Sequence, residues 1–198
     1  MSDVSEQGAL KPAMTMAEAR CAWNPGLDND HLTLGEVLGT LPGDEQGDVP
    51  WLVRLFENPA SPIAFKGAIG LERHDCVHVL LGRGLLQQDE AFVIGFTMGS
   101  SKTISGVESW LFEQVCTYVM PPKNRFDPDE KQAFRIGLEL GKRGRCTRIY
   151  ETPIEAMQRE TIGVIRERVG IDKAALRAAY AFERALVPHT DASRRLPG

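Results

Sequence analysis

The spacing of apolar residues along the chain predicts helices. The clearest pattern lies between residues 104 and 119, where apolar side chains recur at intervals of three and four, as on one face of a helix. Its members are Ile104, Val107, Leu111, Phe112, Val115, Tyr118 and Val119. No segment shows the strict alternation of apolar and polar residues that is typical of a half-buried strand. The pattern therefore predicts an all-α fold, a multi-helix bundle of roughly seven or eight helices.

Capping and helix-breaking residues set the bounds of the other helices. The strongest start signal is Asp127-Pro128-Asp129-Glu130, with Asp at the N-cap, Pro at the first position and Glu at the third. This helix is expected to continue to Arg143, because cations favour a C-terminal end. Further helices are predicted over residues 32–41, 48–58, 61–81, 88–98, 152–168 and 173–186.

A chain of 198 residues is the size of one domain with one core. Residues 1–26 contain prolines and polar residues without a sustained period, and are expected to form a loose N-terminal lead. The single helical domain is predicted to cover residues 27–187. Pro188 should end its last helix and leave a frayed tail, residues 188–198.

Composition and charge exclude several classes of protein. The net charge of −4 gives no indication of a nucleic-acid partner. The longest uncharged run, residues 91–101, is shorter than the roughly 20 residues that cross a bilayer. The N-terminus lacks the basic region and apolar core of a signal peptide.

None of the four cysteines forms a Cys-x-x-Cys pair, which argues for a reducing compartment and against a zinc ribbon. A cytoplasmic protein is expected.

The candidate chemistry lies in His74-Asp75-Cys76-Val77-His78. His74 and His78 are four residues apart, so they share one face of a helix. Asp75 lies about 100° round the helix from His74 and can converge on the same arc. Cys76 points away from that face and is expected to be a small buried thiol.

Glu90 completes this candidate site. Gly82 and Gly84 should end the helix and reverse the chain, so that a following helix returns Glu90 towards the imidazoles. Two imidazoles and two carboxylates can complete the shell of one divalent metal, namely Zn, Fe, Co or Mn. The residues leave two roles open: Asp75 is either a ligand or a group that orients an imidazole, and Glu90 is either a ligand or a general base. The competing interpretation is a hydrogen-bonded surface cluster without metal.

The spacing His-Asp-x-x-His, eleven residues and Glu resembles the metal motif of the coenzyme Q biosynthesis protein four (Coq-four) family. Val79-Leu80-Leu81-Gly82 is similar to the short apolar stretch and glycine that follow the motif in that family. The segment 153–171 is similar to the closing helix of the family and its Gly-Ile ending. The resemblance covers residues 30–172.

The resemblance implies an all-α fold and one divalent metal, zinc for example, held by His74, Asp75, His78 and Glu90. It implies a prenylated hydroxybenzoate or related isoprenoid lipid as partner, peripheral attachment at the inner face of a membrane, and contact with other enzymes of quinone synthesis. The implied reaction is oxidative decarboxylation at ring carbon one, with Glu90 and Asp75 as catalytic residues. Asp89 stands where the family usually has glycine, and this departure concerns the substrate more than the metal.

Two alternatives remain. The first is a non-catalytic lipid-binding or scaffold protein of the quinone-synthesis complex, in which the metal is a structural pin. The second is a phosphohydrolase similar to the HD-domain enzymes, which would use His31, His74 with Asp75, and Asp127 or Asp129. The second gives no role to His78 or Glu90, and its Asp127 is better explained as a helix cap.

Overall fold

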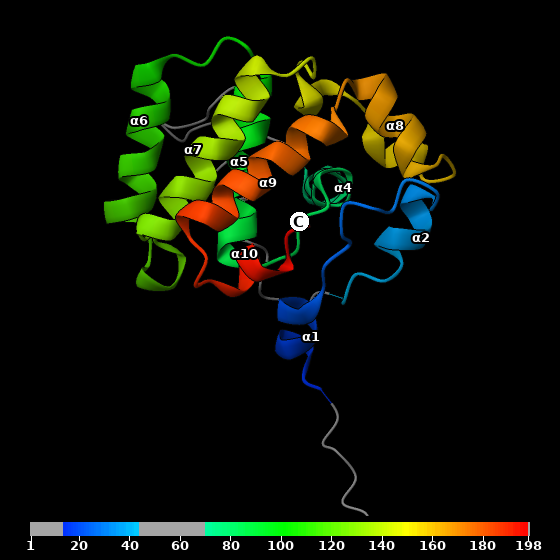
Figure 1. Ribbon diagram of the computed structural model, residues 1–198, viewed down its shortest axis with the longest axis horizontal. Coiled ribbons are helices and arrows are strands. Elements are labelled where there is room, and N and C mark those ends of the chain that lie inside the picture. Colours follow the sequence, from blue (N-terminus) through cyan, green and yellow to red (C-terminus); the bar gives the residue numbers. More distant parts are fainter. Residues whose placement is uncertain (1–13, 44–69, 198) are drawn as a thin grey trace, which may run out of the picture.

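The computed structural model describes residues 14–43 and 70–197 of the chain, and within these ranges the fold is all-α (Figure 1). The prediction of fold class is confirmed. The strand-like pairing found there is an isolated bridge between Thr33 and Thr161. The predicted helix over 48–58 and the first part of the one over 61–81 lie outside the described residues.

Nine α-helices are found in the described ranges. They are α1 (Met16–Ala22), α2 (Leu34–Leu38), α4 (Leu71–Leu81), α5 (Gln87–Ser100), α6 (Gly106–Gln114), α7 (Pro128–Arg143), α8 (Ile162–Val169), α9 (Lys173–Leu186) and α10 (Asp191–Arg195). Figure 1 shows α4 end-on near the centre, with α5, α6 and α7 on one side and α2 and α8 on the other. None of the helices in the described ranges is long and apolar enough to span a bilayer.

The core is built around α5, because this helix is apolar on every side. Six of its apolar side chains are buried: Ala91, Phe92, Val93, Ile94, Phe96 and Met98. A helix that is apolar all round needs partners on all faces. The outer helix α6 is attached to α7 through stacked rings, Phe112 on Phe134, with ring centroids 5.3 Å apart.

Four glycines allow α5 and α7 to touch backbone to backbone. A Cβ atom added to Gly95 would lie 2.1 Å from the carbonyl oxygen of Phe134, and one on Gly137 would lie 2.2 Å from that of Phe92. Gly99 and Gly141 make the same reciprocal approach one turn further on. No larger residue fits at these contacts, so the spacing of two helices in the core depends on them.

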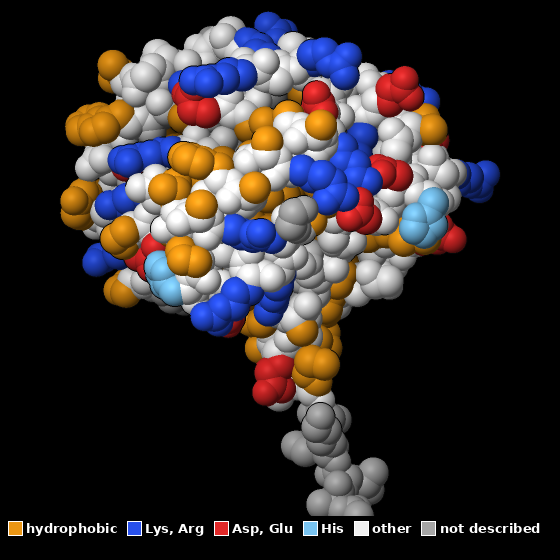
Figure 2. All heavy atoms as spheres, in the orientation of Figure 1, with side chains coloured by type: hydrophobic (Ala, Val, Ile, Leu, Met, Phe, Trp, Pro, Cys, Tyr) orange, Lys and Arg blue, Asp and Glu red, His pale blue; other side chains and the backbone are white. Residues whose placement is uncertain are grey.

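The helix predicted over residues 104–119 is present, but it packs through a different face. It consists of α6 and a π-helical turn, Val115–Val119. Val107 and Tyr118 are 74% and 68% exposed, whereas Phe112 and Cys116 are buried with the polar Glu113. Glu113 can be buried because Arg135 neutralises it. Figure 2 accordingly shows apolar side chains at the molecular surface over α6.

The single helix predicted over residues 152–168 is divided. Two 3₁₀ turns, Ile149–Glu151 and Ile154–Met157, precede α8, which begins at Ile162. The carbonyl oxygens of residues 158 and 160 accept hydrogen bonds from the backbone of α2 at Gly35 and Leu34. These carbonyls are therefore not available for an intrahelical ladder.

Both chain ends differ from the expected loose lead and frayed tail where they are described. Thr15 and Glu18 form a capping box at the start of α1, and the buried Trp23 donates its indole N–H to the Thr40 hydroxyl at 3.0 Å. At the other end, α10 buries Ser193, and Leu196 joins the core. Tertiary hydrogen bonds and burial order these segments in spite of their weak local pattern.

Candidate metal centre

The helix α4 presents its two histidines on one buried face. His74 is 6% exposed and His78 is fully buried, and their ring centroids lie 4.7 Å apart. Gly82 ends the helix in the left-handed conformation, with φ of 69°. A Cβ at this position would lie 2.6 Å from the carbonyl oxygen of Gly26, so a larger residue would be strained in both backbone and packing.

The connection between α4 and α5 determines which nitrogen His78 presents. The Nδ1 atom of His78 lies 2.7 Å from the carbonyl oxygen of Gly84. A carbonyl oxygen can only accept, so Nδ1 carries the proton and donates it. In the neutral ring the lone pair is then on Nε2, which is the atom that faces His74 and Glu90.

Glu90 lies in the first turn of α5 and closes the group. Its Oε2 atom is 2.9 Å from His74 Nε2 and 3.4 Å from His78 Nε2. The two imidazole Nε2 atoms are 3.0 Å apart. Glu90 has 20% of its side chain exposed, so it is the most accessible of the three.

The electrostatic interactions within the group favour a positive charge at its centre. Burial alone would lower the pKa of His78, but the Glu90 carboxylate outweighs burial and raises it. Burial alone would raise the pKa of Glu90, but the imidazoles of His78 and His74 outweigh it and lower it. The arrangement therefore favours a cation between an ionised carboxylate and the ring nitrogens, either a proton or a metal ion.

The donor atoms fit a divalent metal. In a tetrahedral shell with bonds of about 2.0–2.1 Å, ligand atoms lie roughly 3.3–3.4 Å apart. The observed separations of 2.9, 3.0 and 3.4 Å are close to this value and require only a small outward shift. Two imidazoles and one carboxylate form a set used both in catalytic zinc sites and in non-haem iron sites. The group contains no thiolate.

Three of the four predicted ligands come together, and Asp75 does not join them. The ligand atoms of His74, His78 and Glu90 all lie within 4.8 Å of one another. Asp75 is half-buried on α4, one residue round the helix from the histidine face. Its carboxylate acts on the group through charge, since it contributes to the raised pKa of His78. The adjacent Cys76 is a buried thiol, as expected, and burial raises its pKa to about 12.

The phosphohydrolase alternative shares His74 and Asp75 with this site, but its other residues lie elsewhere. His31 is exposed just before α2. Asp127 caps α7 by accepting hydrogen bonds from the backbone of Asp129 and Glu130. Asp129 is paired with His189 at 2.8 Å. The metal group found among the described residues includes none of His31, Asp127 and Asp129.

Sequence reasoning missed Arg83, which is fully buried next to the site. Its guanidinium contacts both carboxylate oxygens of Glu183 on α9, at 2.9 and 3.1 Å, and its Nε atom lies 2.9 Å from Asp89. The guanidinium also lies over the Phe92 ring, 4.6 Å from the centroid. The available signal was Glu183 itself, a charged residue on the otherwise apolar stripe of α9 that contains Leu176 and Tyr180.

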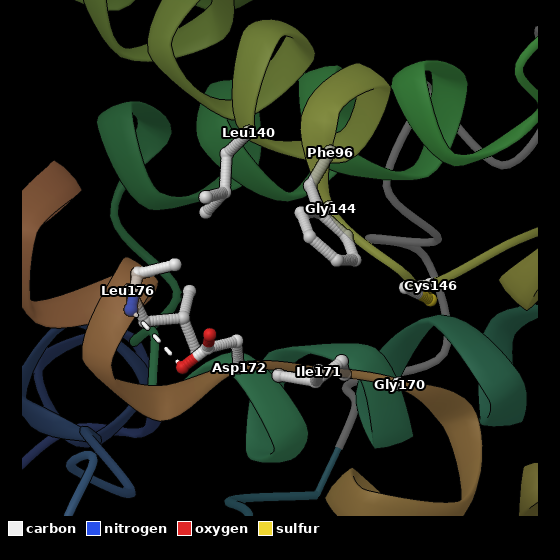
Figure 3. Close-up of a pocket in the computed structure, with 9 residues that line it drawn as sticks. Phe96, Leu140, Gly144, Cys146, Gly170, Ile171, Asp172 and Leu176 are labelled. Atoms are coloured by element: carbon white, nitrogen blue, oxygen red, sulfur yellow. Dashed lines mark hydrogen bonds between the residues drawn. The ribbon is translucent and has the colours of Figure 1, made fainter.

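Two pockets formed by the described residues lie away from the metal group. Figure 3 shows the smaller one between α5, α7 and α9, where Phe96, Leu140 and Leu176 point into an apolar gap. Its volume of about 20 Å³ is enough for one water molecule. The other is an open hollow beside Arg184 and Arg194. Neither pocket is lined by a residue of the metal group.

Comparison of the chain with models of protein families, with curated proteins and with solved structures gives no match. The metal group and the motif that predicted it are therefore the features of this chain that bear on its function.

Proposed function

We propose that this protein binds one divalent metal ion through His74 Nε2, His78 Nε2 and Glu90 Oε2. The observation that supports this most strongly is the convergence of these three atoms, at 2.9, 3.0 and 3.4 Å, in a place where two of the side chains are buried. Histidines on an ordinary surface would be hydrated separately. Here, one ring is oriented by a backbone carbonyl and the carboxylate is held in its ionised form.

The ligand types limit the ion to a small group of divalent metals. Nitrogen and oxygen ligands without thiolate suit Zn²⁺, Fe²⁺, Co²⁺ or Mn²⁺. Three protein ligands leave coordination positions open for water or a substrate. Because Glu90 is the most exposed ligand, we place the open side at the N-terminal end of α5.

We propose further that the site acts on a prenylated hydroxybenzoate. The bond between ring carbon one and the carboxylate breaks with loss of CO₂, and a hydroxyl group whose oxygen comes from water takes its place. Dioxygen accepts the two electrons and two protons that are released and leaves as hydrogen peroxide. The support is the resemblance of the motif to the Coq-four family. A bound metal would supply electrostatic stabilisation of the charge that develops as the carboxylate leaves. His78 would keep its orientation through Gly84. Glu90 would bind the metal through Oε2, which leaves its other carboxylate oxygen, Oε1, to accept a proton.

A second candidate, a structural metal pin in a lipid-binding or scaffold protein, is favoured by one observation. His78 is fully buried and the three ligands join α4 to α5, as a structural site would. A structural pin contributes directly to folding, whereas a catalytic metal leaves folding largely intact when it is removed. Thermal unfolding with and without chelator separates the two.

The test of metal binding is the metal content of protein purified without chelator. We expect one ion per chain in the wild type and in His31→Ala, since His31 is exposed and outside the group. Glu90→Ala should lose most of the metal, because two neutral imidazoles hold a divalent ion weakly. Absence of metal from the wild type, even after reloading with each of the four ions, would overturn the proposal.

The test of the reaction is incubation of metal-loaded protein with a polyprenyl-hydroxybenzoate under air. Formation of the hydroxylated ring, with an equal amount of CO₂, is the expected result. If substrate is unchanged while the metal is bound, the enzymatic proposal fails and the structural pin becomes the better account.

A further inference from the structure

We infer that Arg83, Asp89 and Glu183 form a buried clamp that positions the metal ligands, and this inference depends on the proposed metal site. The clamp consists of one guanidinium and two carboxylates, all with side chains no more than 4% exposed. It joins the connection between α4 and α5 to the last turn of α9. The function assigned to it is to fix where His78 Nε2 and Glu90 Oε2 lie.

Arg83 lies directly beside the group that orients His78. Arg83 precedes Gly84, whose carbonyl oxygen holds the Nδ1–H group of His78 at 2.7 Å. Gly84 is itself tightly enclosed, since a Cβ there would lie 2.7 Å from the Trp23 carbonyl and 3.0 Å from Asp89 Oδ2. Movement of the Arg83 backbone would therefore move the oxygen that orients His78.

Asp89 precedes Glu90 in the first turn of α5. Asp89 Oδ1 contacts the Nε atom of Arg83, and Asp89 Oδ2 accepts a hydrogen bond from the backbone N–H of Leu86 at 3.1 Å. One carboxylate thus holds the arginine and caps the helix that carries Glu90. This gives a structural role to Asp89, at the position where the Coq-four motif usually has glycine.

Glu183 on α9 anchors the clamp to the C-terminal helices. The carboxylate of Glu183 accepts hydrogen bonds from both Nη atoms of Arg83. It also accepts one from Gln88 Nε2 at 2.6 Å. The same Gln88 amide donates to the hydroxyl of Ser193 on α10. One turn earlier on α9, the Tyr180 hydroxyl donates to the carbonyl oxygen of Leu81 at the end of α4. The helix pair that carries the ligands is thus held at several points by the C-terminal helices.

The desolvation cost of the buried charges also points to a positioning role. Buried charges carry a large desolvation cost, and apolar side chains of similar volume would pack this space at least as stably. Stability alone therefore gives a weak reason for one arginine and two carboxylates here. Directional contacts, in contrast, define the geometry of the connection, and ligands require support of this kind because small displacements weaken metal binding.

Glu183→Gln tests the clamp, with Glu113→Gln as the matched control. Glu113 is also buried and also holds an arginine, Arg135, through both oxygens. It lies on α6, at the outer edge of the molecule in Figure 1, whereas α4 is central. Both substitutions remove the charge of a buried carboxylate that holds an arginine. Because Arg135 is about half exposed whereas Arg83 is buried, Glu113→Gln should cost less stability than Glu183→Gln, so the comparison depends on the Co²⁺ spectrum and not on stability alone.

The probe is Co²⁺, followed by its visible absorption, which reports both affinity and the geometry of the ligands. We expect Glu183→Gln to bind Co²⁺ at least about tenfold more weakly than the wild type, with a changed spectrum. Glu113→Gln should keep the wild-type spectrum and an affinity within about twofold, even if its unfolding temperature falls. Wild-type binding and spectrum in folded Glu183→Gln, or equal losses in both variants, would overturn the inference.

A second variant decides the question if Glu183→Gln does not fold. Asp89→Asn keeps an oxygen for the Leu86 N–H group and removes the charge opposite Arg83, so it is the milder change. Weaker Co²⁺ binding with a changed spectrum would support the clamp, and wild-type binding and spectrum in the folded variant would overturn it. If the wild-type protein binds no Co²⁺, the proposed metal site itself is refuted. If the wild type binds Co²⁺ and the clamp variants bind it with wild-type affinity, only the clamp is refuted.

Discussion

At the scale of single side chains, the metal group is defined by contacts that fix which atom each ligand presents. His78 donates from Nδ1 to the Gly84 carbonyl, so its Nε2 faces the centre. Glu90 is kept ionised by two imidazoles, in spite of its burial. Protons and metal ions therefore compete for the same few atoms.

This competition predicts a pH dependence of metal affinity. The Glu90 carboxylate raises the pKa of His78 above its ordinary value of about 6.5, so the proton is displaced only at higher pH than usual. The proton stabilises the metal-free group at low pH and is lost as pH rises through the raised pKa. Zn²⁺ affinity, measured by competition with a chromophoric chelator, should rise from pH 6 to pH 8. Equal affinities at the two values would contradict this, provided that the folded fraction is unchanged.

A second titration is expected at the start of α7. Burial and the neighbouring Asp127 raise the pKa of Glu130 to about 8. The protonated carboxyl is then favoured in the folded protein, so its contribution to stability is present below its unfolded pKa and is lost as pH rises through about 8. Glu130→Gln mimics the protonated form and keeps an acceptor for the Asp127 N–H group, which lies 2.9 Å from Glu130.

We expect urea unfolding of Glu130→Gln to show a free energy above that of the wild type at pH 8, by on the order of 1 kcal/mol. At pH 5 the difference should be much smaller. A variant that is equally destabilised at both values would show that the ionised carboxylate, rather than its protonated form, stabilises the cap.

The sequence predicts the three ligands at this scale because the four-residue spacing and the glycine-containing reversal are local. It does not distinguish Asp75 from them, since a residue 100° round a helix can turn towards or away from a site. It also misses Arg83. A buried arginine is stable only with its carboxylate, and Glu183 is 100 residues away in the chain.

At the scale of helices, the contact between α5 and α7 controls the part of the fold that carries Glu90. Gly137→Ala would place a methyl group 2.2 Å from the Phe92 carbonyl oxygen and force the two helices apart. We expect a loss of at least about 3 kcal/mol in the free energy of unfolding, above the usual cost of overpacking.

The control is Gly106→Ala at the start of α6, where a Cβ meets nothing within 4 Å. This variant should be unchanged or slightly more stable, because alanine favours helix by up to about 1 kcal/mol over glycine. Denaturant unfolding of both proteins provides the comparison. Similar stabilities for the two variants would show that α5 and α7 can separate without cost.

The helices that sequence predicts best are those with strong local signals at both ends. α9 begins and ends where Asp172 and Pro188 indicated, because cap and breaker are both present. The segment before α8 was wrongly predicted as helix, since its carbonyls bond to α2, more than a hundred residues earlier in the chain. The packing face of α6 was misjudged for a similar reason: Arg135 on α7 makes Glu113 suitable for burial.

At the scale of the whole molecule, the C-terminal helices support a site that is formed by the middle of the chain. Arg166 on α8 donates to the Leu80 carbonyl at 2.7 Å, and Tyr180 on α9 donates to that of Leu81. The last carbonyls of α4, which a helix leaves without partners, are thus satisfied by distant side chains. The sequence predicts the all-α class and the metal motif, but these long-range contacts follow only from the assembled fold.

The most direct test of the metal site is anomalous X-ray diffraction from crystals grown with Zn²⁺ and measured at the zinc edge. We predict an anomalous peak about 2.0–2.2 Å from His74 Nε2, His78 Nε2 and Glu90 Oε2, and its loss in Glu90→Ala crystals. A fully loaded crystal with no peak among these three residues, or with its peak at His189 and Asp129, would contradict the site.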